Sequence, residues 1–482
     1  MNYRSTRSKA YVTDSAGAVL EGLAPDGGLY LPEMLPEFDA AACLQLNTIG
    51  MAERILSALL PDIPDMDTLV KRAYMGKFET DDLTPTVGAG PYTVLELFRG
   101  PTSAFKDVAL SMLPQLMTAA KQAKKMQKEI LILTATSGDT GKAALEGFRD
   151  VDGIRICVFY PDGGVSDVQR AQMVTQEGGN VKVCAVRGNF DDAQTGVKQI
   201  FSACQEMELP VALSSANSIN IGRLAPQITY YFKAYRDLLD RGVIAMGESV
   251  NFSVPTGNFG DILAGYLAKQ LGLPVGRLIC ASNANNVLTD FIRTGTYDRR
   301  RALHKTTSPS MDILVSSNLE RLLYLLSGDC ALVAQLMEKL NRDGSYTVPE
   351  TLLKQIQDQF WAEFCTDADA ARTINRVWTD HGYLCDPHTA AGWYAAEQYT
   401  AQTGDRRPMV VLSTASVYKF PAAVLQAIGG DCSGDEFMQM QTLAELTGIP
   451  VPGNLSGLQG KAVRHTDVIG KEEMLSYVLN QK

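Results

Sequence analysis

The chain lacks the features of a membrane protein and of a nucleic-acid-binding protein. Its 482 residues contain no apolar run near the ~18 residues that a bilayer span needs. The net charge is -10 at pH 7, whereas a phosphate backbone is bound through a basic face. We therefore expect neither a membrane nor a nucleic acid as partner. A small anionic substrate is still compatible, because a few local basic groups can outweigh the global charge.

Patterns of metal ligands and disulfides are also absent. The nine cysteines include no Cys-x-x-Cys pair, and the four histidines show no metal-ligand spacing. We expect no metal, and we expect the buried, reduced thiols of a cytoplasmic protein. His388, at the start of a helical run, is expected to cap or pack. The first twelve residues are basic, with Arg4, Arg7 and Lys9, but they lack the length of an organellar transit peptide.

What is present is an alternation of β-branched and amphipathic runs from about residue 90 to 430. Such alternation is typical of α/β units around mainly parallel sheets. We expect strands at 130–134, 154–160 and 250–254, and helices that end near Phe148 and Leu271. The length predicts more than one domain. We divide the chain into a mostly helical N-terminal domain (1–90), a central α/β region (91–430) and a C-terminal segment that wraps the surface (431–482).

A lysine surrounded by apolar and small residues is the first candidate for chemistry. Lys106 lies in Phe98-Arg-Gly-Pro-Thr-Ser-Ala-Phe-Lys-Asp107. A desolvated amine is how lysines that form Schiff bases are kept nucleophilic. Taken alone, this segment is more typical of a surface lysine after a turn.

A glycine-containing loop is the second candidate. Gly257, Asn258, Phe259 and Gly260 follow a strand-like run and precede a helical one. Glycines let backbone N–H groups converge, and a helix N-terminus adds partial positive charge, so a phosphate can bind there. The alternative is a plain tight turn between strand and helix.

A second strand–turn–helix loop, Ser137-Gly138-Asp139-Thr140-Gly141, is rich in hydroxyl and backbone donors. It suits a carboxylate or phosphate that is held by N–H and O–H groups. The loop is not a nucleotide-binding Walker A motif, because Thr136 occupies the first glycine position and Ala143 replaces the final Ser or Thr. No Gly-x-Gly-x-x-Gly follows a strand elsewhere.

Together these segments resemble the long-form threonine synthase family of bacteria and fungi, over nearly the whole chain. The resembling segments are 3–7, 22–30, 98–107, 137–141, 214–223, 255–261, 308–313, 316–321, 386–390 and 412–415. The resemblance implies a two-lobed fold of the pyridoxal-phosphate (PLP) enzymes, fold type II, similar to the tryptophan synthase β subunit. Residues 91–430 would then be its PLP-binding catalytic region.

The resemblance also implies roles for single residues. Lys106 would carry PLP as a Schiff base, and residues 257–260 would hold its phosphate. Thr414 would place a hydroxyl against the pyridine nitrogen. Such a neutral partner leaves the ring a weaker electron sink and favours elimination and replacement over transamination.

The implied reaction is γ-elimination of phosphate from O-phosphohomoserine, followed by β-addition of water to give L-threonine. The candidates for the substrate carboxylate are Ser137, Gly138, Asp139 and Thr140. The candidates for the substrate phosphate are Asn217 and Arg223. The expected assembly is a monomer or a small homo-oligomer.

Two departures from the family pattern bear on the substrate site. Position 99 is Arg99 where a histidine is common, and residues 416–418 read Ser-Val-Tyr where His-Pro-Ala is common. Three other functions stay open. They are a lyase that releases a 2-oxo acid and ammonia from the same substrate, a serine or threonine dehydratase of the same fold, and a binding protein without activity.

Overall fold

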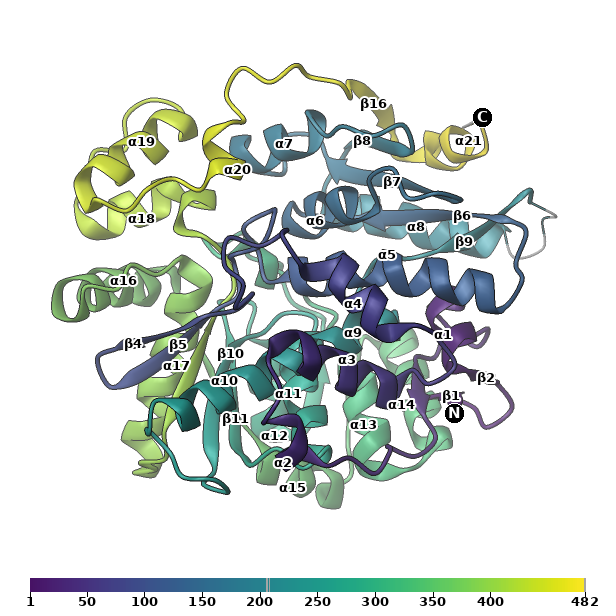
Figure 1. The fold of residues 1–482 in the computed structure, drawn as a ribbon. Helices are drawn as coiled ribbons and strands as arrows, with labels where there is room; N and C mark the ends of the chain where they lie inside the picture. The colour runs from purple at the N-terminus through teal and green to yellow at the C-terminus, as the bar shows by residue number, and fades with distance from the viewer. Residues whose placement is uncertain (205–206, 208, 481–482) are drawn as a thin grey trace.

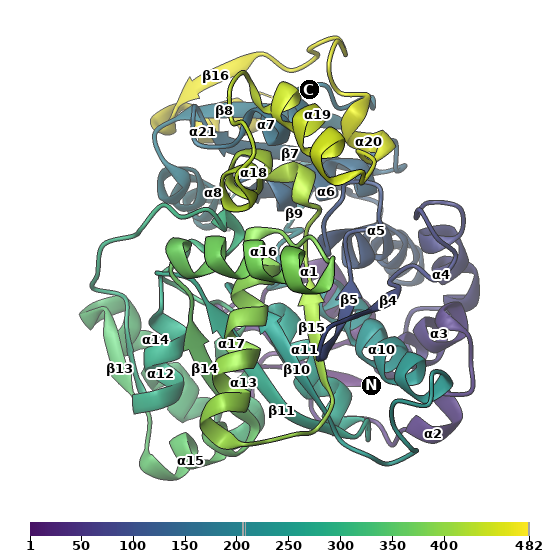
Figure 2. The same ribbon diagram turned by 90° about the vertical axis from the view of Figure 1, so that its left-hand side faces the viewer.

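Two α/β lobes, each around an open and mainly parallel sheet, make up the molecule (Figure 1). The computed structural model describes residues 1–204, 207 and 209–480. Figure 2 shows the lobe with the six-stranded sheet below and the lobe with the five-stranded sheet above. This arrangement is the expected two-lobed α/β fold.

The six-stranded sheet has the strand order β14-β11-β10-β15-β5-β4. All its pairs are parallel except the edge pair of β4 and β5. Its strands are β4 (Thr86–Ala89), β5 (Tyr92–Glu96), β10 (Val250–Pro255), β11 (Val275–Ser282), β14 (Phe360–Phe364) and β15 (Met409–Ser413). The central strands β10 and β15 are buried throughout, as apolar strands covered on both faces are.

The five-stranded sheet has the order β16-β8-β7-β6-β9 and is parallel throughout. Its strands are β6 (Glu129–Ala135), β7 (Ile154–Pro161), β8 (Val181–Arg187), β9 (Val211–Ser214) and β16 (Asp467–Gly470). Two small antiparallel sheets complete the β structure. They contain β1 (Asn2–Ser5), β2 (Val12–Asp14) and β3 (Tyr30–Pro32), and β12 (Thr296–Asp298) and β13 (Ser345–Thr347).

Helices fill the sequence between and around these strands. Up to residue 204 they are α1 (Ser15–Glu21), α2 (Ala40–Cys43), α3 (Thr48–Leu59), α4 (Met66–Tyr74), α5 (Lys106–Ala123), α6 (Asp139–Phe148), α7 (Asp167–Val174) and α8 (Phe190–Cys204). From residue 209 to 381 they are α9 (Ile221–Leu224), α10 (Ile228–Asp240), α11 (Gly260–Gln270), α12 (Val287–Thr294), α13 (Leu319–Ser327), α14 (Cys330–Asp343), α15 (Glu350–Gln359) and α16 (Asp367–His381). The last are α17 (Pro387–Thr403), α18 (Pro421–Ile428), α19 (Glu436–Thr447), α20 (Gly453–Ser456) and α21 (Met474–Leu479), and the 3-10 turns are η1 (Ala225–Gln227), η2 (Pro309–Met311), η3 (Val417–Lys419) and η4 (Lys471–Glu473).

An unusually close crossing joins α5 to α6. Pro114 lies inside α5 and has no N–H to donate to the carbonyl oxygen of Leu110, one turn earlier. Gly147 of α6 lies against that oxygen, and a Cβ added to Gly147 would come within 2.0 Å of it. Only glycine lets the two backbones approach so closely.

The predicted strands and helices of the central region are confirmed by β6, β7, β10, α6 and α11. The C-terminal segment contributes more than a surface wrap, because β16 pairs in parallel with β8. The domain boundaries stay predictions. The boundary placed at residue 90 falls between β4 and β5, which pair with each other.

The cysteine prediction is confirmed for all but one residue. Eight cysteines are buried and free, and Cys432 is free and exposed. Within the described ranges, no helix is both long and apolar enough to cross a bilayer.

Candidate active site

The predicted site residues lie where parallel strands end. The segments that carry Lys106, Thr414 and the 257–260 loop follow β5, β15 and β10, which are neighbours in one sheet. Asp139 follows β6 of the other sheet. Ligands of open α/β sheets bind outside the carboxyl ends of the strands. The site therefore lies where the two lobes face each other.

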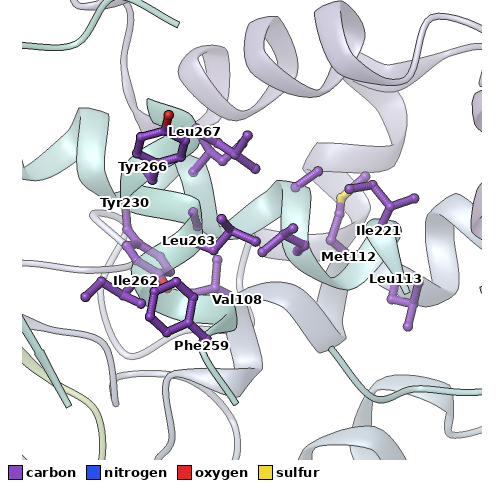
Figure 3. Packing of buried hydrophobic residues seen from close by; sticks show 14 of the residues in the cluster. Val108, Met112, Leu113, Ile221, Tyr230, Phe259, Ile262, Leu263, Tyr266 and Leu267 are labelled. Atoms are coloured by element: carbon purple, nitrogen blue, oxygen red, sulfur yellow. The ribbon is translucent and has the colours of Figure 1, made fainter. Parts of the chain in front are cut away.

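Apolar packing holds the lysine helix against the glycine loop. Figure 3 shows Val108 and Met112 of α5 in one cluster with Phe259 and Leu263 at the start of α11, and these side chains belong to the same buried core. Interiors packed in this way are rigid. The backbone at Lys106 is consequently fixed relative to the loop.

Lys106 is the first residue of α5, and its side chain is buried, with 8% of the residue exposed. Its Nζ donates a hydrogen bond to Ser310 Oγ at 3.4 Å and lies 3.7 Å from Asp139 Oδ2. Burial lowers the pKa of Lys106 to about 8, with Asp139 opposing the shift and Arg223 and Lys419 adding to it. A larger share of the amine is therefore neutral near pH 7 than for an exposed lysine.

Asp139 lies at the centre of a buried polar cluster. Its Oδ1 is 2.5 Å from Lys419 Nζ and accepts a hydrogen bond from Gln169 Nε2 at 2.9 Å. Its Oδ2 accepts a hydrogen bond from Ser310 Oγ at 3.1 Å. Burial alone raises the pKa of a carboxyl group, but Lys419 and Lys106 hold the pKa of Asp139 well below its usual range. Asp139 is therefore an anion beside the Lys106 amine.

The glycine loop has the form that a phosphate requires. Within the described part of the chain, the N–H groups of residues 257–260 donate to no other residue. Phe259 has a φ of 61°, a left-handed conformation that turns the chain into α11. A Cβ at Gly257 would lie 2.9 Å from the Ser310 carbonyl oxygen. Unpaired N–H groups at a helix N-terminus fit an anion such as the phosphate of PLP.

Thr414 is buried beside the lysine segment. Its carbonyl oxygen accepts a hydrogen bond from Phe105 N at 2.8 Å, and Ser416 N donates to Ser103 O at 3.1 Å. These bonds hold the end of β15 next to the residue that precedes Lys106.

Hydrogen bonds to the hydroxyl of Thr136 hold the Ser137–Thr140 loop in its conformation. Thr136 Oγ1 accepts hydrogen bonds from Gly138 N at 3.0 Å and Gly141 N at 2.8 Å. The side chains of Ser137 and Thr140 are half-buried, and neither makes a side-chain hydrogen bond to the described residues. Their hydroxyls are therefore available to a ligand, whereas the Asp139 carboxylate is already paired.

Arg223 of α9 is a buried cation without a carboxylate partner in the described ranges. Its Nη1 donates to Ala216 O at 2.7 Å, and its buried Nε has no hydrogen-bond partner. Burial lowers its pKa to about 10. Asn217 is half-buried in the loop that precedes α9. An uncompensated buried guanidinium indicates an anionic ligand, since buried charges are otherwise paired.

The side chains at both departures from the family pattern already form hydrogen bonds within the protein. Arg99 donates to Glu96 Oε2 at 2.6 Å and to Glu79 Oε2 at 3.1 Å, so two carboxylates already neutralise it. The hydroxyl of Tyr418 donates to the carbonyl oxygen of Ile449 in the C-terminal segment. Arg99 is not a free cation for substrate phosphate.

The contributions of Ser310, Lys419 and Gln169 were not predicted from the sequence, and His388 was expected only to cap or pack. His388 Nε2 accepts a hydrogen bond from Ser310 N at 3.2 Å, and its Nδ1 lies 2.6 Å from Asp386 Oδ2. His388 thus supports the loop that carries Ser310, beyond the capping or packing role expected. Ser310 and His388 lie in segments that resemble the family. Gln169 and Lys419 do not, and no local sequence pattern marks them.

The described residues contain no group of three or more His, Cys, Asp or Glu side chains that could hold a metal ion. Lys106 Nζ faces a hydroxyl and a carboxylate, and unpaired backbone N–H groups follow β10 of the same sheet. This combination suits a phosphorylated carbonyl cofactor.

Comparison with known proteins agrees with this geometry. The family described as pyridoxal-phosphate dependent enzyme matches residues 78–415. The families described as threonine synthase N terminus and threonine synthase, C-terminal, match residues 2–74 and 389–474. Between them these matches cover most of the chain.

Individual relatives agree as well. A human protein named threonine synthase-like 1 is 39% identical over 85% of this chain, which spans only 57% of that protein's length. Threonine synthase of Pseudomonas aeruginosa is 42% identical over 89% of this chain and 90% of its own. The crystal structure of PLP-bound threonine synthase from Brucella melitensis is 39% identical, with a TM-score of 0.86 over 99% of both chains. The chain belongs to the threonine synthase family, and its cofactor is pyridoxal phosphate.

Proposed function

We propose that this enzyme is a lyase that converts O-phosphohomoserine and water into L-threonine and phosphate. One observation carries the proposal. A buried lysine amine has a pKa that is lowered by burial and by the charge of Arg223, a buried arginine without an anion of its own, and a loop of unpaired N–H groups follows β10 of the same sheet. Two anion sites around one amine suit a phosphorylated cofactor and a phosphorylated amino acid. The match to both terminal threonine synthase families supports the same reaction.

The substrate groups are assigned by charge. Arg223 and Asn217 would bind the substrate phosphate, because Arg223 is the buried cation that lacks a partner. The substrate carboxylate would be held by Ser137, Gly138 and Thr140. Asp139 is removed from that set, because two carboxylates repel each other and its oxygens already face two lysines.

The cofactor would be held by Lys106, by residues 257–260 around its phosphate and by Thr414 at its ring. When bound it supplies an electron sink that stabilises negative charge next to the substrate nitrogen. Lys106 Nζ is the base for the proton on Cα, because it is the buried amine of this site. Ser310 Oγ and Asp139 Oδ2 hold Nζ in place and stabilise the proton it has taken. A proton leaves Cβ as phosphate departs from Cγ, Cγ then gains a proton, and water adds at Cβ.

The reaction is tested by following three products together. Purified enzyme loaded with PLP is mixed with O-phosphohomoserine, and phosphate, threonine and 2-oxobutyrate are measured. We expect phosphate and threonine in equal amounts. Phosphate with 2-oxobutyrate and ammonia would identify the lyase without water addition. Serine or threonine consumed without phosphate release would identify a dehydratase, and PLP binding without turnover would identify a binding protein.

Replacement of Lys106 tests the catalytic assignment. We expect Lys106→Ala to abolish covalent PLP attachment and to lower threonine formation by about 1,000-fold or more, because both the Schiff base and the base at Cα are lost. The measurements are the absorbance of bound PLP and the product assay. Lys124→Ala, which removes an exposed lysine paired with Asp14, is the control. Ordinary activity in Lys106→Ala would refute the scheme.

We also propose that the enzyme works in the cytoplasm as a monomer or small homo-oligomer, with the three domains bounded near residues 90 and 430. Its nine free cysteines support a reducing compartment. Light scattering on the purified chain would determine the assembly, and limited proteolysis would locate the boundaries.

A further inference from the structure

Lys419 is a completely buried lysine to which no role toward the substrate or the cofactor has been assigned. It ends η3, directly after β15, and its side chain has 0% exposure. Its Nζ lies 2.5 Å from Asp139 Oδ1 and 3.3 Å from Thr102 O. Thr102 lies on the loop that carries Lys106, and Asp139 begins α6 of the other lobe. A buried ammonium is retained only where such partners compensate it.

Two lysines therefore share one carboxylate, and they share it unequally. Lys419 is at 2.5 Å from Oδ1, whereas Lys106 is at 3.7 Å from Oδ2. Gln169 also donates to Oδ1, and Ser310 donates to Oδ2. These four contacts leave the carboxylate one orientation, and in that orientation its close ion pair is with Lys419.

We propose that Lys419 is a positioning residue that holds Asp139 back from the Lys106 nitrogen, so that this nitrogen can release its proton during the reaction. The effect on the reaction rests on the proposed function, whereas the arrangement of the charges does not. Lys419 makes no direct contact with Lys106 in the described structure and acts through Asp139. Without Lys419, the carboxylate would turn to its one remaining buried cation and form a close pair with Lys106.

The charges that face Lys106 from the surrounding elements fix the expected direction. They are Asp139 on α6, Lys419 on η3, Arg223 on α9 and Asp261 on α11. Lys419 and Arg223 favour the neutral nitrogen, and Asp139 favours the protonated one. Loss of Lys419 removes one positive charge and frees one negative charge, and both changes favour the protonated nitrogen.

The test is a pH titration of the holoenzyme that follows the absorbance of the cofactor bound to Lys106. The absorbance reports the proton on the nitrogen that joins Lys106 to PLP. We expect Lys419→Met to raise the midpoint by about one pH unit or more, the shift that an opposite charge produces at close range. Lys419→Arg keeps the charge and should titrate close to the wild type. Asp139→Asn should lower the midpoint below that of the wild type.

The double variant Lys419→Met/Asp139→Asn keeps the proposal testable if Lys419→Met does not fold. It removes both members of the close ion pair, so neither is left buried without the other. Its midpoint should lie at or below that of the wild type, so a raised midpoint would count against the proposal. A purely structural role for Lys419 would lower the bound PLP without moving the midpoint in either lysine variant, and that result would overturn the inference.

The titration and the product assay can fail separately. An enzyme that bound PLP but made no threonine would overturn the proposed function, while the midpoints would still report whether Lys419 controls the nitrogen. An unshifted midpoint in an enzyme that makes threonine would overturn only the role of Lys419.

Discussion

Arg223 is a single side chain that suits an anionic ligand but lowers the stability of the ligand-free fold. A buried guanidinium without a carboxylate is destabilising until an anion arrives. Its lowered pKa has burial as its main cause. Binding of phosphate to such a site should therefore stabilise the folded enzyme.

We expect Arg223→Met to raise the KM for O-phosphohomoserine by about 10- to 100-fold, which corresponds to one charge-assisted hydrogen bond. The same variant should unfold at a higher temperature than the wild type in phosphate-free buffer. Added inorganic phosphate should raise the unfolding midpoint of the wild type and not that of Arg223→Met. Arg223→Lys is the charge-retaining control, and an unchanged KM in Arg223→Met would remove Arg223 from the substrate site.

At the scale of residues, the sequence allowed Lys106 to be chosen by resemblance, but it could not distinguish the environments of two lysines. Lys106 and Lys419 both stand beside a phenylalanine at the start of a helix. Their different roles depend on the distances to Asp139, which belongs to a segment hundreds of residues from Lys419. No local pattern records such a contact.

At the scale of elements, the spacing between α5 and α6 sets the geometry of the site. The first residues of these helices are Lys106 and Asp139, and their bodies cross where Gly147 lies against Leu110 O. The missing N–H of Pro114 leaves that oxygen without a helical partner. A change at the crossing is therefore transmitted along two rigid helices to the active site.

We expect Gly147→Ala to destabilise the fold by about 1–3 kcal/mol, since the new methyl group overlaps a backbone oxygen. It should also move Lys106 relative to Asp139 and shift the midpoint of the holoenzyme titration. Denaturant unfolding and the absorbance titration measure the two effects. Gly448→Ala changes a glycine with no atom within 4 Å of the added Cβ, and serves as a control for stability. Its φ of 71° gives it a small cost of its own, so a Gly147→Ala cost no larger than this control would contradict the crossing argument.

The elements that could be predicted are those with strong local patterns. The apolar runs at β6, β7 and β10 were recognised because buried parallel strands are continuously apolar. β16 was not, because Asp467–Gly470 is four residues long and half of it is exposed. Its strand character depends on β8 offering an edge.

At the scale of the whole molecule, the C-terminal segment contacts both lobes. Asn454 accepts a hydrogen bond from Ser103 Oγ at 3.0 Å and donates one to Gly100 O at 3.3 Å, on the loop that carries Lys106. Further on, β16 extends the five-stranded sheet, and Met474 and Val478 pack into its core. The yellow ribbon in Figure 1 follows this path over the top of the molecule.

We expect deletion of residues 463–482 to lower the free energy of unfolding by about 3–6 kcal/mol, the loss of two buried apolar side chains, and to promote aggregation through the uncovered edge of β8. Thermal unfolding and light scattering measure these effects. Val468→Thr, at a largely exposed position of β16, should leave both unchanged. A truncated enzyme as stable and dispersed as the full chain would show that β16 is dispensable.

The position of β16 also has a consequence for biosynthesis. Four strands of its sheet are translated by residue 214, but the fifth, β16, begins only at residue 467. While the residues between these strands are translated, the nascent lobe therefore carries an open edge that other nascent chains can join. A chain whose synthesis stops between residues 214 and 467 keeps that edge open and becomes a natural client for chaperones.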